Sequence, residues 1–493
     1  MGSFAALLAL TAVGAASASA RDSAPGQHGR GSKPHLFLMV LVHLSAREHP
    51  LQRGGAAALI VCFALHVALV QVVDDLGWNN VGWHNKEMKT PHSDRLLREG
   101  VELDRNYVFM YCSPTRSSIL SGRLPHHVNQ INLDNSNVGE GIPAEMTIIA
   151  KKLSHAGYRT HMVGKWHCGC AEWAQIPMSK GFDTSLHYFA GAEDHWTQGS
   201  CIDQLCNAPD PEKQHKSPVD LWDTNKPAWG MNNTMYGGYL YNKRVLDTIA
   251  AHDKSTPLFC EYHPSAWFCA WPGTAYTCTF CGKITDTIDF DFAAVYIAFQ
   301  QNHEPLEAPS EFIDRYPQNY NVDRLRYAGM TSFWDESVGN ITAALKDNDM
   351  YNDSLIVLTG DNGGPVYWTL SKYAHGAGAN NYPLFGGKVS NWEGGIRVAG
   401  FVSGGALPPS ARGTKLEQFI HGCDWFATFC ALANVSKADP VAVAHGFADV
   451  DSLDMWPLLT GAVHVSPRTE IPAAIEFENK LSLVNVTAII DSE

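Results

Sequence analysis

The segment CSPTRSSILSGR, which starts at Cys112, places a thiol next to residues that bind anions. Pro114 suits the first turn of a helix, because a backbone N–H at that position would have no intrahelical partner. The free N–H groups of that turn would bind an anion together with Ser117 and Ser118, and Arg116 adds a forked cation. Cys112 would therefore lie at the mouth of an anion pocket. The simpler interpretation is a buried thiol beside a capped helix.

Two pairs of oxygen-donor residues each follow an apolar run. Asp74 and Asp75 follow one run, and Asp361 and Asn362 follow another. Ligand sites in open parallel sheets form outside the carboxyl ends of the strands, so both pairs would meet there. Carboxylate and amide oxygens suit a hard divalent cation such as Ca²⁺ or Mg²⁺. Each pair alone is also typical of a turn, but together they predict a metal site.

Further cations and imidazoles stand in polar motifs along the chain. Lys165 and His167 flank a tryptophan, so an extended backbone would place both side chains on one face. Lys388 lies in the glycine-rich run GGKVSNWEGG, and His303 lies in NHEPL. Residue type alone gives these four residues no functional role, because a lone lysine is usually a solvated charge and a lone loop histidine is usually structural.

The combination of these motifs resembles the sulfatase family. The run from Cys112 resembles the family's first signature, and residues 164–169, GKWHCG, resemble its second, with Cys168 in place of the usual leucine. The resemblance extends from about residue 33 to 457 and is closest to the arylsulfatase B-like branch. It implies that Cys112 is oxidised to formylglycine, whose hydrated aldehyde attacks the sulfur of a sulfate ester.

The same resemblance implies roles for the remaining polar residues. Arg116 and His167 would steady the formylglycine, while the two lysines and His303 would contact the sulfate and serve the leaving group. The implied catalytic residues are Cys112, Arg116, Lys165, His167, His303 and Lys388. One Ca²⁺ per chain would be held by Asp74, Asp75, Cys112, Asp361 and Asn362.

Alternating apolar and helical patterns predict the elements that position these residues in a layered α/β domain. We expect strands at residues 69–73, 158–163, 294–299 and 354–359, and helices at 117–122, 147–156, 238–252 and 327–347. The resemblance implies an alkaline-phosphatase-like layered sheet flanked by helices, with a catalytic domain at residues 33–465. Residues 466–493 would be the truncated start of a smaller C-terminal domain that is otherwise missing.

Two segments depart from the family pattern, at about residues 42–71 and 260–295. Both interrupt apolar runs that would be continuous strands in a relative. Genuine loops of this lineage and wrongly assigned exon boundaries both remain open interpretations. The apolar run at 56–73 is long enough to span a bilayer. It contains His66 and Gln71 and leads directly into the predicted metal site, so we do not expect a membrane span there.

The first twenty residues indicate the secretory pathway. An apolar run at residues 7–16 precedes Ala18-Ser19-Ala20, which fits a signal-peptide cleavage site. Twelve cysteines fit an oxidising compartment, and the resemblance implies a disulfide in the region of Cys201 and Cys206. We therefore expect a secreted or lysosomal protein. N-glycosylation triplets start at Asn232, Asn340, Asn352, Asn434 and Asn485.

The overall charge bears on possible partners. The 493 residues carry a net charge of −14 and no basic run, so we do not expect a nucleic-acid partner. The leading hypothesis is an arylsulfatase acting on a sulfated small molecule or glycan, with a formylglycine-generating enzyme as a partner. One alternative is a non-catalytic relative that binds sulfated glycans. Another is a phosphatase or phosphonate hydrolase, but those enzymes generally have Ser or Thr where this chain has Cys112.

Overall fold

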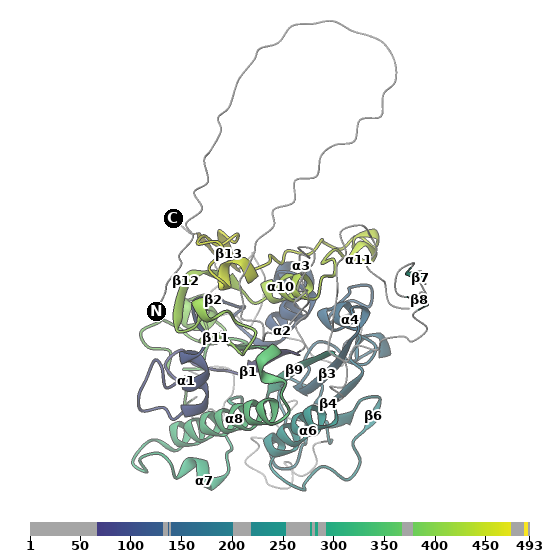
Figure 1. Ribbon diagram of the computed structural model, residues 1–493. Helices are drawn as coiled ribbons and strands as arrows, with labels where there is room; N and C mark the ends of the chain where they lie inside the picture. Colours follow the sequence, from purple (N-terminus) through teal and green to yellow (C-terminus); the bar gives the residue numbers. More distant parts are fainter. Residues whose placement is uncertain are drawn as a thin grey trace, which may run out of the picture. The chain divides into compact units, whose positions relative to one another are not determined.

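A computed structural model describes most of the chain from residue 67 onward (Figure 1). The described residues are 67–131, 137, 140–200, 218–252, 277–278, 282–283, 292–366, 378–474 and 488–491. All of them belong to one compact unit, Ala58–Glu493. The predicted signal peptide, the first insert up to residue 66, the Cys201–Cys206 region and Asn485 lie outside the described residues.

A ten-stranded sheet forms the centre of this unit, and β1 lies inside it. Parallel neighbours flank β1 on both sides, β10 on one and β9 on the other, and β9 is in turn parallel to β3. These are the four strands that the sequence predicts. In sheet order the strands are β12 (Thr414–His421), β2 (Val101–Tyr107), β11 (Gly400–Ser403), β10 (Ser354–Gly360), β1 (Val67–Val73), β9 (Phe292–Phe299), β3 (Tyr158–Lys165), β4 (Thr184–Tyr188), β5 (Trp222–Asp223) and β6 (Lys226–Pro227).

Helices cover both faces of the sheet (Figure 1). One face packs against α8 (Val322–Asp347), α6 (Gly237–Ala251) and α1 (Pro91–Arg98). The other packs against α2 (Cys112–Ser121), α4 (Ile149–His155), α10 (Asp424–Leu432) and α12 (Trp456–Leu459). The described residues also form the short helices α3 (Pro125–Val128), α7 (Ser310–Ile313), α9 (Glu393–Ile396) and α11 (Pro440–Ala444). The predicted layered α/β fold is confirmed.

The sequence of β1, VALVQVV, explains its central place. A strand that is buried on both faces reads as a nearly continuous apolar run rather than as an alternating one. Leu69 and Val73 pack in the core under α8 and α6, whereas Val72 packs in the core under α2. Helices on both faces therefore hold β1 in place. The acidic pair that follows β1 lies at the carboxyl ends of the strands.

The sheet takes up residues that the sequence analysis assigned to the two inserts. Residues 67–71 form most of β1, which pairs along its whole length with β10 and β9. Residues 292–295 form the first half of β9 in the same way. Inside the second insert, β7 (Thr277–Cys278) and β8 (Gly282–Lys283) form a small antiparallel pair. Among the described residues, β1 and β9, which follow the two inserts, are therefore paired along their whole length.

The described part of the chain contains no helix with the length and apolar character that a bilayer crossing requires. Within the predicted apolar run at 56–73, residues 67–73 are β1 of the central sheet. Near the other end of the chain, β13 (Glu470–Ala474) pairs with β14 (Ala488–Asp491) in an antiparallel ribbon. Ile471 packs against Tyr107 and Phe109, which anchors this ribbon to the body of the molecule.

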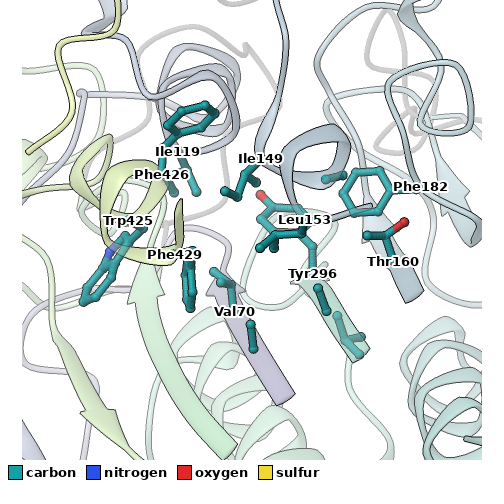
Figure 2. Close-up of a pocket in the computed structure, with 14 residues that line it drawn as sticks. Val70, Ile119, Ile149, Leu153, Thr160, Phe182, Tyr296, Trp425, Phe426 and Phe429 are labelled. Atoms are coloured by element: carbon teal, nitrogen blue, oxygen red, sulfur yellow. The ribbon is translucent and has the colours of Figure 1, made fainter. Parts of the chain in front are cut away.

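A small cavity of about 30 Å³ lies between the sheet and helices α2, α4 and α10 (Figure 2). Its lining is almost wholly apolar and includes Val70, Leu153 and Phe429, with Thr160 and Tyr296 as the polar exceptions. None of the predicted site residues borders it. It is a gap in the packing of the core and not a substrate pocket.

Candidate active site

The two acidic pairs meet at the carboxyl ends of β1 and β10. Val73 and Gly360 are partners in the parallel register, so the residues after them emerge side by side. The backbone N–H of Asp75 donates to Asp361 Oδ1 at 3.1 Å, and Asn362 Nδ2 donates to Asp75 Oδ1 at 2.7 Å. All four residues of the two pairs are buried. The expected convergence of these side chains is therefore present.

Cys112 opens helix α2, five residues earlier than the predicted helix start, and faces the same cluster. Its Sγ lies 3.6 Å from Asp74 Oδ1, and the residue is only 1% exposed. Burial raises the pKa of the Cys112 thiol to about 12. One turn along α2, Arg116 donates to Asp361 Oδ2 from Nε at 3.0 Å and from Nη2 at 2.7 Å. Helix α2 therefore holds both the thiol and the cation that orients Asp361.

Two buried lysines reach the cluster from separate segments. Lys165, the last residue of β3, donates from Nζ to Asp74 Oδ2 at 2.7 Å. Lys388 lies 2.7 Å from Asp75 Oδ1. Burial by itself would raise the pKa of Asp75, but the charge of Lys388 brings it below its ordinary value. Burial would lower the pKa of Lys388, yet Asp75 lifts it well above the ordinary value.

His303 adds an imidazole to the same cluster. Its Nε2 lies 3.9 Å from Asp75 Oδ2. Its Nδ1 lies 2.8 Å from the carbonyl oxygen of Glu304, which can only accept, so Nδ1 carries the proton in this arrangement. Burial and the charge of Lys388 hold the pKa of His303 well below its ordinary value. A neutral imidazole with Nε2 facing the acidic pair can accept a proton or bind a metal.

His167 lies two residues beyond β3 at the same edge of the sheet. Its backbone N–H donates to the carbonyl of Phe189 at 3.2 Å, and its φ of 51° is in the left-handed region. The residue is 2% exposed. A Cβ at Gly191 would lie 2.9 Å from the His167 ring, so a glycine there makes room for the imidazole. The structure thus places His167 at the carboxyl end of β3, two residues after the buried Lys165.

The oxygen-rich set fits a hard cation. Asn362 Oδ1 is buried and has no hydrogen-bond partner in the described part of the chain. An unmatched buried polar atom costs about 1–3 kcal/mol, so a ligand for this oxygen would offset a real penalty. Ligand atoms of Asp74, Asp75, Cys112 and His303 lie within 4.8 Å of one another. The sequence analysis gave His303 a catalytic role, whereas the structure brings it as close as the predicted metal ligands.

Some supporting residues have no signal in the sequence. Tyr327 of α8 donates from its hydroxyl to the carbonyl of Asp75 at 2.6 Å and accepts from the N–H of Gly77 at 3.1 Å. Asn302 donates its N–H to the carbonyl of Asp74 at 2.6 Å. Tyr327 looks like an ordinary core residue in its helix, because nothing local reveals that its hydroxyl lies under the acidic pair.

The comparisons with known proteins agree on one family. A family model described as Sulfatase matches residues 67–435. The chain is 32% identical to mouse arylsulfatase J over 402 residues, which cover 81% of this chain and 56% of that protein. It is 25% identical to dog N-acetylgalactosamine-6-sulfatase over 411 residues, covering 80% of this chain and 66% of the relative. The chain therefore spans little more than half of the mouse protein and about two thirds of the dog protein.

A solved structure supports the same assignment. The crystal structure of Ps i-CgsB in complex with k-i-k-neocarrahexaose superposes with a TM-score of 0.65 at 26% identity. The match covers 83% of this chain and 79% of the other. The large mixed sheet with helices on both faces is accordingly the alkaline-phosphatase-like fold of the sulfatases. By the extent of the family match and by this fold, the chain belongs to the sulfatase family.

Proposed function

We propose that this chain hydrolyses sulfate monoesters with a formylglycine made from Cys112 and a Ca²⁺ held by Asp74, Asp75, Asp361 and Asn362. The observation that carries the proposal is the meeting of the Cys112 thiol, three carboxylates and three cationic side chains in one buried cluster. Strongly perturbed groups that converge in this way are typical of catalytic sites. The match to the Sulfatase family model supports this assignment.

The charges of the cluster suit an anionic ester. The three carboxylates of Asp74, Asp75 and Asp361 form ion pairs with Arg116, Lys165 and Lys388, so their charges balance. A bound divalent cation would therefore leave the pocket positive, and a positive pocket with low-dielectric walls attracts an anion. The formylglycine would supply a hydrated aldehyde as nucleophile, and Ca²⁺ would supply a Lewis acid.

The side chains of this protein would divide the remaining work. Arg116 holds Asp361 through two hydrogen bonds, which fixes the carboxylate before substrate arrives. Lys165 and Lys388 are placed to neutralise the oxygens of the sulfate group. His303 has its Nδ1 proton directed to the Glu304 carbonyl, so its Nε2 carries no proton and could accept one. The ammonium of Lys165 or Lys388 could donate the proton that the leaving oxygen needs.

The relatives point to a class of substrate. N-acetylgalactosamine-6-sulfatase and the oligosaccharide complex of Ps i-CgsB favour a sulfated glycan over a small aryl ester as the natural substrate. We also propose passage through the secretory pathway, where a formylglycine-generating enzyme would convert Cys112. The exposure of Asn340, Asn352 and Asn434 is compatible with glycosylation on that route.

The decisive experiment uses the full chain expressed with and without a formylglycine-generating enzyme. Mass spectrometry of the peptide that contains Cys112 reports conversion, and release of the phenol from an aryl sulfate reports turnover, with and without a Ca²⁺ chelator. We expect turnover that needs both the converted residue and the cation. A converted protein that binds a sulfated glycan without hydrolysing any sulfate ester would contradict the proposal and favour a binding role.

A further inference from the structure

The side-chain amide of Asn381 joins three loops around the acidic cluster. Its Oδ1 accepts from the N–H of Trp78 at 3.3 Å and from the N–H of Gly364 at 3.1 Å. Its Nδ2 donates to the carbonyl of Gly364 at 2.8 Å and to the carbonyl of Gly386 at 3.0 Å. The residue is 2% exposed. A carboxamide offers two acceptor lone pairs and two donor hydrogens, so all four are used.

Each of these contacts lies close in sequence to one member of the cluster. Trp78 is three residues after Asp75, Gly364 is two after Asn362, and Gly386 is two before Lys388. Those three members meet at one oxygen, because Lys388 Nζ and Asn362 Nδ2 both lie 2.7 Å from Asp75 Oδ1. The distances around that oxygen therefore depend on how the three loops are held relative to one another.

The loops pack closely around this link, which leaves no room for a side chain at Gly364 or Gly387. A Cβ at Gly364 would lie 2.6 Å from the Cβ of Ala379, and a Cβ at Gly387 would lie 2.6 Å from the carbonyl oxygen of Gly364. The backbone of Lys388 also donates to Gly364 at 3.2 Å, so the loops touch through their main chains. An aspartate in place of Asn381 would turn an oxygen toward two carbonyl oxygens and lose both donated hydrogen bonds.

We propose that Asn381 is a positioning residue that fixes Lys388 and the two acidic loops at the separation needed to bind Ca²⁺ and the sulfate group. This role rests on the proposed function. Within the described residues, the side-chain hydrogen bonds of Asn381 reach neither Cys112 nor any carboxylate of the cluster, so it would act through the loops that it joins. Supporting residues of this kind typically contribute about 10–100-fold in metal affinity or activity.

The test compares Asn381→Asp and Asn381→Ala with a matched control, Asn380→Ala. Asn380 is the neighbouring residue of the same type, but among the described residues its Oδ1 accepts only from the N–H of Tyr382 in its own loop. Ca²⁺ affinity is measured by titration calorimetry, and kcat and KM by aryl sulfate turnover on converted protein, at a temperature where circular dichroism shows each variant folded. We expect both Asn381 variants to lose about 10–100-fold in Ca²⁺ affinity and kcat. The control should match the wild type.

Two outcomes would overturn this role. The first is folded Asn381 variants with wild-type Ca²⁺ affinity and kcat, whatever their thermal stability, in a wild type that is itself active. The second needs no variant: rapid hydrogen exchange at the Trp78 and Gly364 amides of the wild type would show that the two hydrogen bonds accepted by Asn381 Oδ1 do not persist. That measurement decides the matter if neither variant folds. A converted wild type without Ca²⁺ binding or turnover would instead overturn the proposed function, and this role with it.

Discussion

Two buried cysteines in this molecule lie in surroundings that look alike at first. Cys112 opens α2 and Cys423 is the N-cap of α10, and both are at most 1% exposed. The Cys112 Sγ lies 3.6 Å from Asp74 Oδ1, and the Cys423 Sγ lies 3.7 Å from Asp424 Oδ1. An arginine is close to each aspartate. Burial raises the pKa of both thiols, so neither is activated by a simple shift of its own.

The difference lies in how the neighbouring carboxylates are satisfied. Asp424 takes two hydrogen bonds from Arg468, at 2.6 and 2.7 Å, and two more from the backbone N–H groups of His421 and Leu453. One carboxylate and one guanidinium thus close the Cys423 centre, which joins the segment after residue 466 to α10. A thiol beside a saturated ion pair is a structural element.

The Cys112 centre is built from more segments and is less complete. Three carboxylates and three cations reach it from β1, α2, β3, β10 and the Lys388 loop. Even so, Asn362 Oδ1 has no hydrogen-bond partner within the described residues. Several like charges held together, with an unmatched oxygen among them, mark a site that is organised to bind something else. Burial and an ion pair alone do not distinguish the two centres.

The largest expected difference between the two centres is the effect on turnover of replacing each cysteine. Cys112→Ala should lower aryl sulfate turnover on the order of 10³-fold or more, because the variant has no side chain that can become the nucleophile. Cys423→Ala should leave turnover per folded molecule at the wild-type level. Initial rates on both purified variants measure this, and a similar loss in the two would contradict the division of roles.

Breaking the ion pair of the Cys423 centre tests its structural role. Arg468→Met leaves Asp424 buried without its partner, so the free energy of unfolding should fall by about 3–5 kcal/mol. Urea denaturation measures the change. Turnover per folded molecule should stay as in the wild type. A loss of kcat in the folded variant would mean that the two centres are coupled.

Calcium should stabilise the molecule through only one of the two centres. At a Ca²⁺ concentration 100 times Kd, binding should add about 2.7 kcal/mol to the free energy of unfolding. Asn362→Leu removes the unmatched oxygen and should lose most of that gain, whereas Cys423→Ala should keep it. Thermal unfolding with and without the cation gives the comparison. Equal stabilisation of all three proteins would place the cation elsewhere.

The smallest expected effect is a pH dependence at the Cys423 centre. Burial, with a contribution from Arg468, holds the pKa of His421 well below its ordinary value of 6.5. Below pH 6.5, His421 therefore binds a proton in the unfolded chain but not in the folded chain. The free energy of unfolding falls as the pH falls. The slope should be up to about 1.4 kcal/mol per pH unit from this residue.

His421→Asn provides the check on that slope. Urea denaturation at pH 7.5 and 5.5 should show a smaller acid loss in the variant than in the wild type, because the asparagine does not titrate. Asparagine also keeps an acceptor for the N–H of Cys423, which His421 Nδ1 accepts at 3.2 Å. An unchanged slope would show that other groups carry the acid sensitivity.

Local pattern was enough to predict much of the candidate site. The apolar runs before Asp74 and Asp361 are visible in the sequence, and parallel strands with polar residues at their carboxyl ends meet at one edge. The four predicted strands are all present, and they are neighbours in the sheet. The limits of the inserts were harder, since residues 67–71 and 292–295 carry no mark that separates a strand from an apolar loop.

The chemical types of the cluster could be read from the sequence: a thiol at a helix start, two oxygen-donor pairs and a few cations in polar motifs. Which of these groups contact the same atom became clear from the folded molecule. Lys388 and Asn362 both reach Asp75 Oδ1, and Asn381 joins the three loops that carry them. The reason is physical: covalent spacing sets what a strand or turn presents, whereas contacts between residues some 300 positions apart depend on how the sheet and its loops pack.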